Sequence, residues 1–523
     1  MHYREKEYMT KGRNLKINFI VALFSQLMSV IFAFIVPKMM IRYYGPQMHG
    51  VISTITNLIT YLILVEAGLA TASVQGLYKP LKEQDYRSIN AGLNAISRFY
   101  IKIGSIFSVL VIGLAVVYPL FAADGMSYHL IFILILISGI AQTIEFFMCR
   151  KYRILLQADK RLYVVNFVNA LGTILQGVLR ILFMYMKFDI YIVQLVPAIV
   201  YVFRLIILVV YIRGHYTFLD KNVPPNYNIS KKRWNALVHQ VTNLVVNNTD
   251  SIVLSKAVGY SSVSIYSIYQ MVVSNINGFL TQALSNAITA NFGHLFVEKD
   301  LEKSVKAYDY YEKIYYYIIS IIFSGCAVAL YPFINLYIGE VNGLKYADYK
   351  LVILFVINAI LCNLRIPQLT IVTAVGHFKE TQWHAIAEAI CNVLVSVILV
   401  KKLGIYGVLI GTTCSYLIRD IMFIVYVNKN IFYRNLTSTV KNLTKMVTLF
   451  TMTVCCGIII SKFIGPDTWI KWGVVSATTF VIGVIFVSIY LLMFDREIFS
   501  LILNVIGVNK IMKGKNKKNL SHK

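Results

Sequence analysis

Arginines inside long apolar segments are the residues of this chain best suited to bind an anion. Arg180, Arg204 and Arg365 each lie within such a segment. A guanidinium stays charged and donates paired hydrogen bonds that match the oxygens of a phosphate. A charge inside a membrane costs a few kcal/mol unless it meets a partner or water. The three arginines therefore predict a cationic, hydrated site for a phosphate-bearing ligand.

Neutral polar residues accompany the arginines at helical spacing. Between 166 and 180 they recur every three or four residues, which places them on one face of a helix. Such stripes either form hydrogen bonds between packed helices or line one water-filled cavity, and the cavity accounts for all of them at once. The candidates for substrate binding are Asn169, Gln176, Arg180, Arg204, Asn243, Asn247, Asn275, Gln282 and Arg365.

Four acidic residues within apolar segments are candidates for ion coupling: Glu66, Glu145, Asp250 and Glu388. Each either forms a salt bridge with an arginine or binds a proton or sodium ion that drives transport. The two interpretations stand equally for Asp250 and Glu66. A salt bridge is favoured for Glu145 and Glu388.

Motifs for catalysis are absent from the sequence. It contains no Gly-rich loop ending in Gly-Lys-Ser/Thr, no His-Glu-x-x-His and no Gly-x-Ser-x-Gly. The segments expected outside the cell, such as 123–129 and 465–471, are too short for a catalytic domain. We therefore predict no enzyme, no cofactor and no metal site, and keep a membrane polymerase or ligase as an alternative.

The elements that must position these residues are membrane-spanning helices. Of the 523 residues 58% are hydrophobic, far above the roughly 45–50% of soluble domains. A helix crosses a bilayer with about 20 apolar residues. The sequence predicts an all-α integral membrane protein with about fourteen spans, at 17–41, 51–71, 101–122, 130–149, 163–186, 190–212, 236–255, 263–292, 314–338, 351–375, 383–400, 405–427, 446–464 and 472–494.

The net charge of +26 is concentrated between the apolar segments. With both termini in the cytoplasm, roughly 35 basic residues fall inside and roughly 10 outside, as the positive-inside rule requires. This distribution predicts loops that face anionic lipid headgroups, and it disfavours nucleic acid as a partner.

Two halves of six helices are expected, followed by a helix pair. The polar loop 213–233 divides the first six spans from the next six. The turn between the first and second spans aligns with the turn between the seventh and eighth at one offset, with Gly45 matching Gly259 and Gly50 matching Ser264. We predict two pseudo-symmetric lobes at 1–220 and 221–430, then helices 13 and 14 with a basic cytoplasmic tail at 431–523.

Three motifs resemble those of bacterial polysaccharide repeat-unit flippases, within the superfamily of multidrug extruders and lipid II flippases. They are RYYG at 42–45, continuing to Ser53; EAGL at 66–69; and NTDSIVLS at 248–255, followed by Gly259 and IYS at 265–267. The resemblance implies two lobes that open alternately to the two sides of a bacterial cytoplasmic membrane.

The resemblance also implies an undecaprenyl-pyrophosphate-linked oligosaccharide as substrate. The arginines would hold the pyrophosphate, and the Asn and Gln stripes would meet sugar hydroxyls. Membrane lipids, a proton or sodium ion, and a polysaccharide polymerase or other assembly proteins are the further partners expected. A cation-coupled multidrug exporter of the same fold and a nontransporting assembly scaffold stay open as alternatives.

Overall fold

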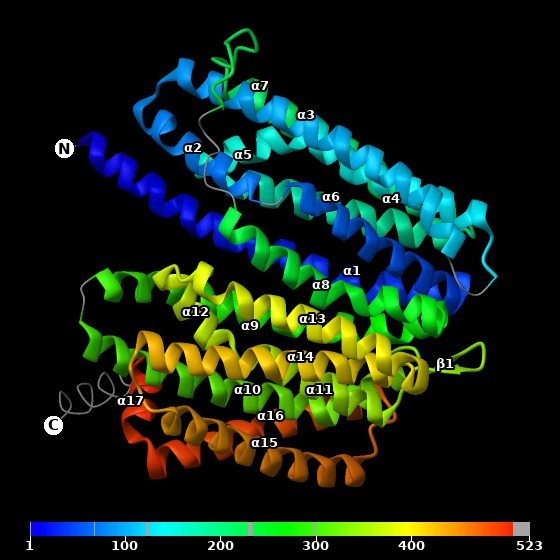
Figure 1. Cartoon of the computed structure of the whole chain (residues 1–523), viewed down its shortest axis with the longest axis vertical. Helices are drawn as coiled ribbons and strands as arrows, with labels where there is room; N and C mark the ends of the chain where they lie inside the picture. Colours follow the sequence, from blue (N-terminus) through cyan, green and yellow to red (C-terminus); the bar gives the residue numbers. More distant parts are fainter. Residues whose placement is uncertain (1, 67, 122–124, 228–233, 298–299, 506–523) are drawn as a thin grey trace, which may run out of the picture. The chain divides into compact units, whose positions relative to one another are not determined.

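The prediction of an all-α membrane protein is confirmed. A computed structural model describes residues 2–66, 68–121, 125–227, 234–297 and 300–505, and most of these residues are helical (Figure 1). In the described part the only strands are β1 (Glu340–Val341) and β2 (Leu344–Lys345), which pair as a short hairpin. The basic tail predicted at the C-terminus falls largely on 506–523, outside the described residues.

The chain divides into two compact units. The first comprises Met1–Met271, Val341–Gly343 and Glu388–Gly411, and the second comprises Val272–Glu340, Leu344–Ala387 and Thr412–Lys523. The first unit contains α1 (His2–Leu62), η1 (Ile63–Glu66), α2 (Leu69–Glu83), α3 (Tyr86–Val117), η2 (Tyr118–Phe121), α4 (Tyr128–Ile144), η3 (Glu145–Cys149), α5 (Arg150–Ala158), α6 (Leu162–Tyr185), α7 (Ile190–His215) and α8 (Trp234–Ala257).

The second unit is built around α10. Three long helices, α9, α13 and α14, have residues in both units. The bounds of these three are α9 (Tyr260–Val297), α13 (Phe378–Leu403) and α14 (Ile405–Tyr426). The helices that lie wholly in the second unit are α10 (Leu301–Tyr337), α11 (Tyr349–Leu364), α12 (Ile366–Val375), η5 (Val427–Ile431), α15 (Leu436–Ile464), α16 (Trp469–Phe494) and α17 (Arg496–Val505).

The described residues of all fourteen predicted segments are mostly helical, and eleven helical spans in the described residues are long and apolar enough to cross a membrane. The first of them, Ile20–Glu66, covers most of the segments predicted at 17–41 and 51–71. Two further predicted segments correspond to α8 and α9, which are not among the eleven. Polar residues such as Asn243, Asn247 and Asp250 lower the hydropathy of α8. Membrane crossing by α8 and α9 therefore stays a prediction.

The first two predicted segments meet at Gly45. This residue has φ 86° and ψ 165°, so the helical path is interrupted within α1, and Pro46 follows. Such a backbone conformation favours glycine because it has no Cβ. Gly259, its predicted counterpart, also has a positive φ of 109° and separates α8 from α9.

These two turns pack against each other inside the first unit. A Cβ on Gly50 would lie 1.8 Å from the carbonyl oxygen of Tyr260, so only glycine permits this approach of α1 to α9. Next to it, His49 Nδ1 and Ser264 Oγ are 2.8 Å apart in a buried hydrogen bond. The matched turns thus share a contact. The duplication itself, and the domain limits at 220 and 430, stay predictions.

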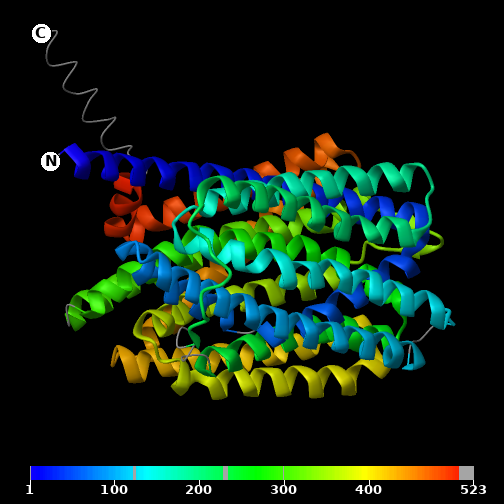
Figure 2. The same ribbon diagram turned by 90° about the horizontal axis from the view of Figure 1, so that it is seen from above.

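Buried apolar side chains hold each unit together. In the first unit, α1 packs against α6 and α8, and α7 packs against α4 and α6. Figure 2 shows the same ribbon in a view turned by 90°. In the second, α10 packs against α11, α15 and α16.

Candidate functional site

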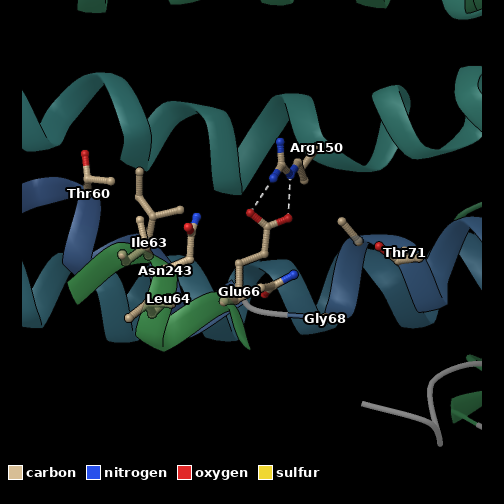
Figure 3. Close-up of a pocket in the computed structure, with 11 residues that line it drawn as sticks. Thr60, Ile63, Leu64, Glu66, Gly68, Thr71, Arg150 and Asn243 are labelled. Atoms are coloured by element: carbon tan, nitrogen blue, oxygen red, sulfur yellow. Dashed lines mark hydrogen bonds and ion pairs between the residues drawn. The ribbon is translucent and has the colours of Figure 1, made fainter. Parts of the chain in front are cut away.

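A cavity of about 360 Å³ opens in the first unit beside Glu66 (Figure 3). We call it the Glu66 cavity. The end of α1, the turn η1 and the start of α2 supply one side, and Arg150 on α5 and the α8 residues supply the rest. Its lining residues are Thr60, Ile63, Leu64, Glu66, Gly68, Ala70, Thr71, Arg150, Gln240, Asn243 and Leu244.

A two-point ion pair crosses this cavity. Arg150 Nε donates to Glu66 Oε1 at 2.6 Å, and Arg150 Nη2 pairs with Glu66 Oε2 (Figure 3). Tyr100 on α3 donates its hydroxyl to the same Oε1 at 2.6 Å. Paired bonds of this kind hold both side chains in one orientation. The sequence analysis allowed a salt bridge at Glu66 but did not identify Arg150 as the partner.

A second carboxylate extends the cluster away from the cavity. Glu145 begins the π-helical turn η3, and its Oε1 accepts from Arg150 Nη1 at 3.3 Å. Arg153 Nη1 also pairs with Glu145 Oε1. Glu66, Glu145, Arg150 and Arg153 together carry two negative and two positive charges, so the cluster is formally neutral.

Neutral polar groups from α8 face the ion pair. Asn243 and Gln240 are exposed residues that line the cavity, one helical turn apart. Asn243 Oδ1 accepts from Asn247 Nδ2 at 3.0 Å, which leaves the Asn243 NH2 group available. The two predicted residues Asn243 and Asn247 are thus neighbours on one helix, and Asn243 lines the cavity.

Arg180 lies at a second cavity of the first unit, which we call the Arg180 cavity. The cavity measures about 280 Å³, and Gln176, Thr173 and Arg180 of α6 line it opposite α1. Arg180 Nη2 donates to Gln194 Oε1 at 2.5 Å, and Nε donates to the carbonyl of Val193 at 3.5 Å. Both of these partners are neutral. The polar stripe predicted on α6 therefore places Gln176 and Arg180 together.

Arg204 also has neutral partners. Its Nη2 donates to the carbonyl of Asn169 at 3.5 Å, and its guanidinium carbon lies 5.0 Å from the centre of the Tyr201 ring. The side chain crosses Gly172 of α6, where a Cβ would lie 1.9 Å from Arg204 Nε. Gly172 and Arg180 are eight residues apart, about 12 Å along α6. Arg204 and Arg180 therefore lie at different heights along the interface between α6 and α7.

Arg365 belongs to the second unit. It stands between α11 and α12, where the predicted segment 351–375 is broken, and it is buried. Its guanidinium carbon lies 4.6 Å from the centre of the Tyr416 ring. The aromatic face is a favourable surface for a cation.

The other predicted residues are distributed over both units. Asp250 on α8 is buried and accepts from the Tyr266 hydroxyl at 2.9 Å. Glu388 on α13 is fully buried, and Asn275 on α9 is half-buried. Gln282 lies on α9 among side chains outside the described residues. No group of three or more His, Cys, Asp or Glu that could hold a metal occurs in the part of the chain that the structure describes.

A second buried carboxylate cluster, in the second unit, was missed by sequence reasoning. Glu312 on α10 is fully buried and accepts from Arg434 Nη2 at 2.8 Å, Asn442 Nδ2 at 2.9 Å and Thr439 Oγ1 at 3.0 Å. Arg434 also pairs with Asp309 at 3.1 Å. We call this the Glu312 cluster. Through Thr439 and Asn442 the cluster joins α15 to α10 by hydrogen bonds.

Comparison with known proteins identifies solved structures that share the fold of this chain. No family model matches the sequence, and no curated protein matches it. A multidrug resistance MATE transporter of the MOP superfamily, in an inward-facing conformation, is 15% identical with a TM-score of 0.64, over 81% of this chain and 99% of that one. The chain therefore shares the fold of that transporter.

Two further structures agree. The lipid II flippase MurJ, in an inward closed conformation, is 12% identical with a TM-score of 0.63, over 91% of this chain and 98% of that one. A eukaryotic MATE transporter is 12% identical with a TM-score of 0.58, over 83% and 99%. Solved proteins with this fold thus include both transporters and a lipid flippase. At such identities the likeness concerns the fold, which does not by itself specify a substrate.

Proposed function

We propose that this protein is a flippase that moves undecaprenyl-pyrophosphate-linked oligosaccharide units from the inner to the outer leaflet of a bacterial cytoplasmic membrane. The lipid-linked unit would then enter surface polysaccharide assembly, in which a polymerase would act on it next. The observation that carries the proposal is the pair Arg180 and Arg204, two half-buried arginines whose hydrogen-bond partners are neutral.

The choice of partner determines what an arginine can bind. Within the described residues, no carboxylate lies within 4.0 Å of Arg180 or Arg204, whereas Arg150, Arg153 and Arg434 each pair with at least one. A guanidinium with a carboxylate partner already has its counter-charge. One that donates only to amides and carbonyls has no directly paired counter-charge, which favours an anionic ligand.

We propose the phosphate groups of a lipid as the anion that binds these arginines. A pyrophosphate presents several oxygens in the geometry that a guanidinium recognises through two parallel hydrogen bonds. Gln176 and Thr173, which line the Arg180 cavity, supply further neutral donors for those oxygens. Arg365, beside the Tyr416 ring, is proposed as the corresponding cation of the second unit.

The movement between leaflets would be alternating access, without ATP hydrolysis by this chain. The buried carboxylates of Asp250 and Glu388 are proposed as sites where a proton or sodium ion couples to the change of conformation. We place both termini in the cytoplasm, where the basic loops face anionic headgroups.

Complementation of a deletion strain tests the proposal. Arg180→Ala, at wild-type abundance, is expected to restore little surface polysaccharide and to leave lipid-linked sugar in the cytoplasmic leaflet. Arg98→Ala is the matched control, because Arg98 is an exposed arginine on α3 that lines neither cavity. It is expected to restore both to wild-type levels. Full restoration by Arg180→Ala and Arg204→Ala would contradict the assignment of the arginines.

A cation-coupled multidrug exporter is the second candidate. Its specific support is the carboxylate of Glu66 in the wall of a cavity, together with the MATE transporters among the structural neighbours. An exporter predicts that deletion sensitises cells to cationic drugs and leaves surface polysaccharide unchanged. That outcome would replace the flippase proposal.

A further inference from the structure

We infer that the Glu66 cavity binds an uncharged, hydroxyl-rich group such as a sugar ring, separately from the arginine site that takes the phosphate. The inference rests on the proposed function for its biological meaning, since it divides the recognition of one substrate between two cavities. The evidence for it is local to the first unit.

The charge balance of the cavity excludes a strongly charged ligand. Arg150 is held by Glu66 through two points and by Glu145 through a third. Arg153 compensates Glu145, so the four charges sum to zero. An anion entering the cavity would meet the Glu66 carboxylate, and a cation would meet Arg150. Neither finds a net counter-charge, whereas a neutral ligand avoids both penalties.

The hydrogen-bonding groups of the cavity suit hydroxyls. A hydroxyl both donates and accepts, and so do the side-chain amides of Gln240 and Asn243 taken together. Among the described residues the Gln240 side chain has no protein partner recorded, and Asn243 uses its carbonyl oxygen but not its NH2 group for Asn247. Thr71 adds an exposed hydroxyl on the facing helix α2.

The apolar part of the lining and the size of the cavity agree with a ring. Ile63, Leu64 and Leu244 supply aliphatic surface for the C–H face of a sugar, while the polar groups lie at its edges. Gly68, at φ 76° before α2, removes a side chain from the wall. The volume of about 360 Å³ lies within the roughly 300–1,000 Å³ of small-molecule sites.

A binding experiment with two probes separates this inference from the flippase proposal. The full-length purified protein is mixed with N-acetylglucosamine or galactose, observed by saturation-transfer difference NMR, and in parallel with inorganic pyrophosphate, observed by phosphorus NMR. Asn243→Leu and Gln240→Leu are expected to raise the dissociation constant for the sugar about 5-fold each and to leave that for pyrophosphate unchanged. Arg180→Ala is expected to raise the dissociation constant for pyrophosphate and to leave that for the sugar unchanged.

Gln75→Leu is the matched control, because Gln75 is exposed on α2 and does not line the cavity. It should change neither constant. No saturable sugar signal in the wild type, or a signal unaffected by both α8 substitutions, would overturn the inference while the pyrophosphate result stands. If Arg180→Ala left the dissociation constant for pyrophosphate unchanged while the sugar results held, the flippase proposal would be contradicted and the sugar site would stand.

Discussion

The Glu66 cavity and the Glu312 cluster contain the same chemical groups in different surroundings. Each pairs a buried glutamate with an arginine from a later helix or loop, and each adds a tyrosine hydroxyl. In the first unit the Arg150 side chain is 24% exposed and borders a cavity. In the second, Glu312 is 0% exposed and Arg434 only 10%.

The number of hydrogen-bond partners explains the difference. Glu312 accepts from Arg434, Asn442 and Thr439, and also from Tyr308 and Gln368, so its oxygens are saturated by protein donors. A buried carboxylate with complete pairing stabilises the helices that supply the donors. Glu66 has Arg150 and Tyr100, and neutral amides face it across open space. Arg434 also lines a cavity, of about 830 Å³, but Glu312 does not line it, whereas Glu66 itself lines the Glu66 cavity. The comparison teaches that a carboxylate saturated by protein donors serves packing, while one that lines a cavity beside unused amides is placed for recognition.

The largest effect is expected from Glu312→Ala. Removing the carboxylate leaves buried donors such as Asn442 Nδ2 without this acceptor, and Arg434 keeps Asp309 as a carboxylate partner beside the neutral acceptors Asn428 and Thr439. The free energy of unfolding should fall by about 3 kcal/mol, the lower end for breaking one side of a buried pair. Unfolding by SDS in mixed micelles measures it. Glu83→Ala, which breaks an exposed pair with Lys79, should change it by about 0–1 kcal/mol. Equal losses in the two variants would remove the distinction between closed and exposed pairs.

A smaller loss of stability and a larger loss of function are expected from Glu66→Gln. The amide keeps one acceptor for Arg150, and Glu145 still compensates the guanidinium. Stability should fall by about 1–2 kcal/mol, because hydrogen bonds to a charged group are weakened but not lost. Sugar binding should weaken together with polysaccharide assembly in complemented cells. A variant as unstable as Glu312→Ala, with sugar binding intact, would show that the Glu66 pair serves packing only.

The smallest effect on stability is expected from Gly172→Ala. The added Cβ would fall on the Arg204 guanidinium, which is the far end of a flexible side chain and can move at a cost of about 1 kcal/mol. Displacing it should nonetheless reduce complementation. Gly113→Ala on α3 is the control, since nothing lies within 4 Å of the added methyl there, and it should stabilise by about 0.5–1 kcal/mol. Identical behaviour of the two variants would argue against a role for the position of Arg204.

Local patterns were sufficient to predict the helices. Apolar length located the fourteen segments, and the gap left between the predicted segments 17–41 and 51–71 contains Gly45, where α1 is interrupted. The three-four spacing also brought Gln176 and Arg180 to one cavity. These predictions succeed because both the helical period and the bilayer thickness are short-range constraints.

Pairings over long sequence separations were beyond the reach of sequence reasoning. Glu66 meets Arg150 across 84 residues, and Glu312 meets Arg434 across 122. Neither arginine lies on a polar stripe, and Arg150 belongs to a basic run that the positive-inside rule explains by itself. Glu312 lies just before a predicted segment, where a charge costs little and draws no attention. Only the packing of helices brings such groups together.

Translocation in proteoliposomes tests most directly the claim that arginines with neutral partners receive a phosphate-bearing lipid. Purified wild type, Arg180→Ala and Arg98→Ala are reconstituted with a fluorescent pyrophosphate-linked polyprenyl sugar, and its transfer between leaflets is followed by chemical quenching from outside. We predict transfer by the wild type and by Arg98→Ala, and a rate at least about tenfold lower for Arg180→Ala, since a charge-assisted contact contributes about 1.5–3 kcal/mol. Equal rates for all three proteins, or transfer only of cationic dyes, would contradict the account.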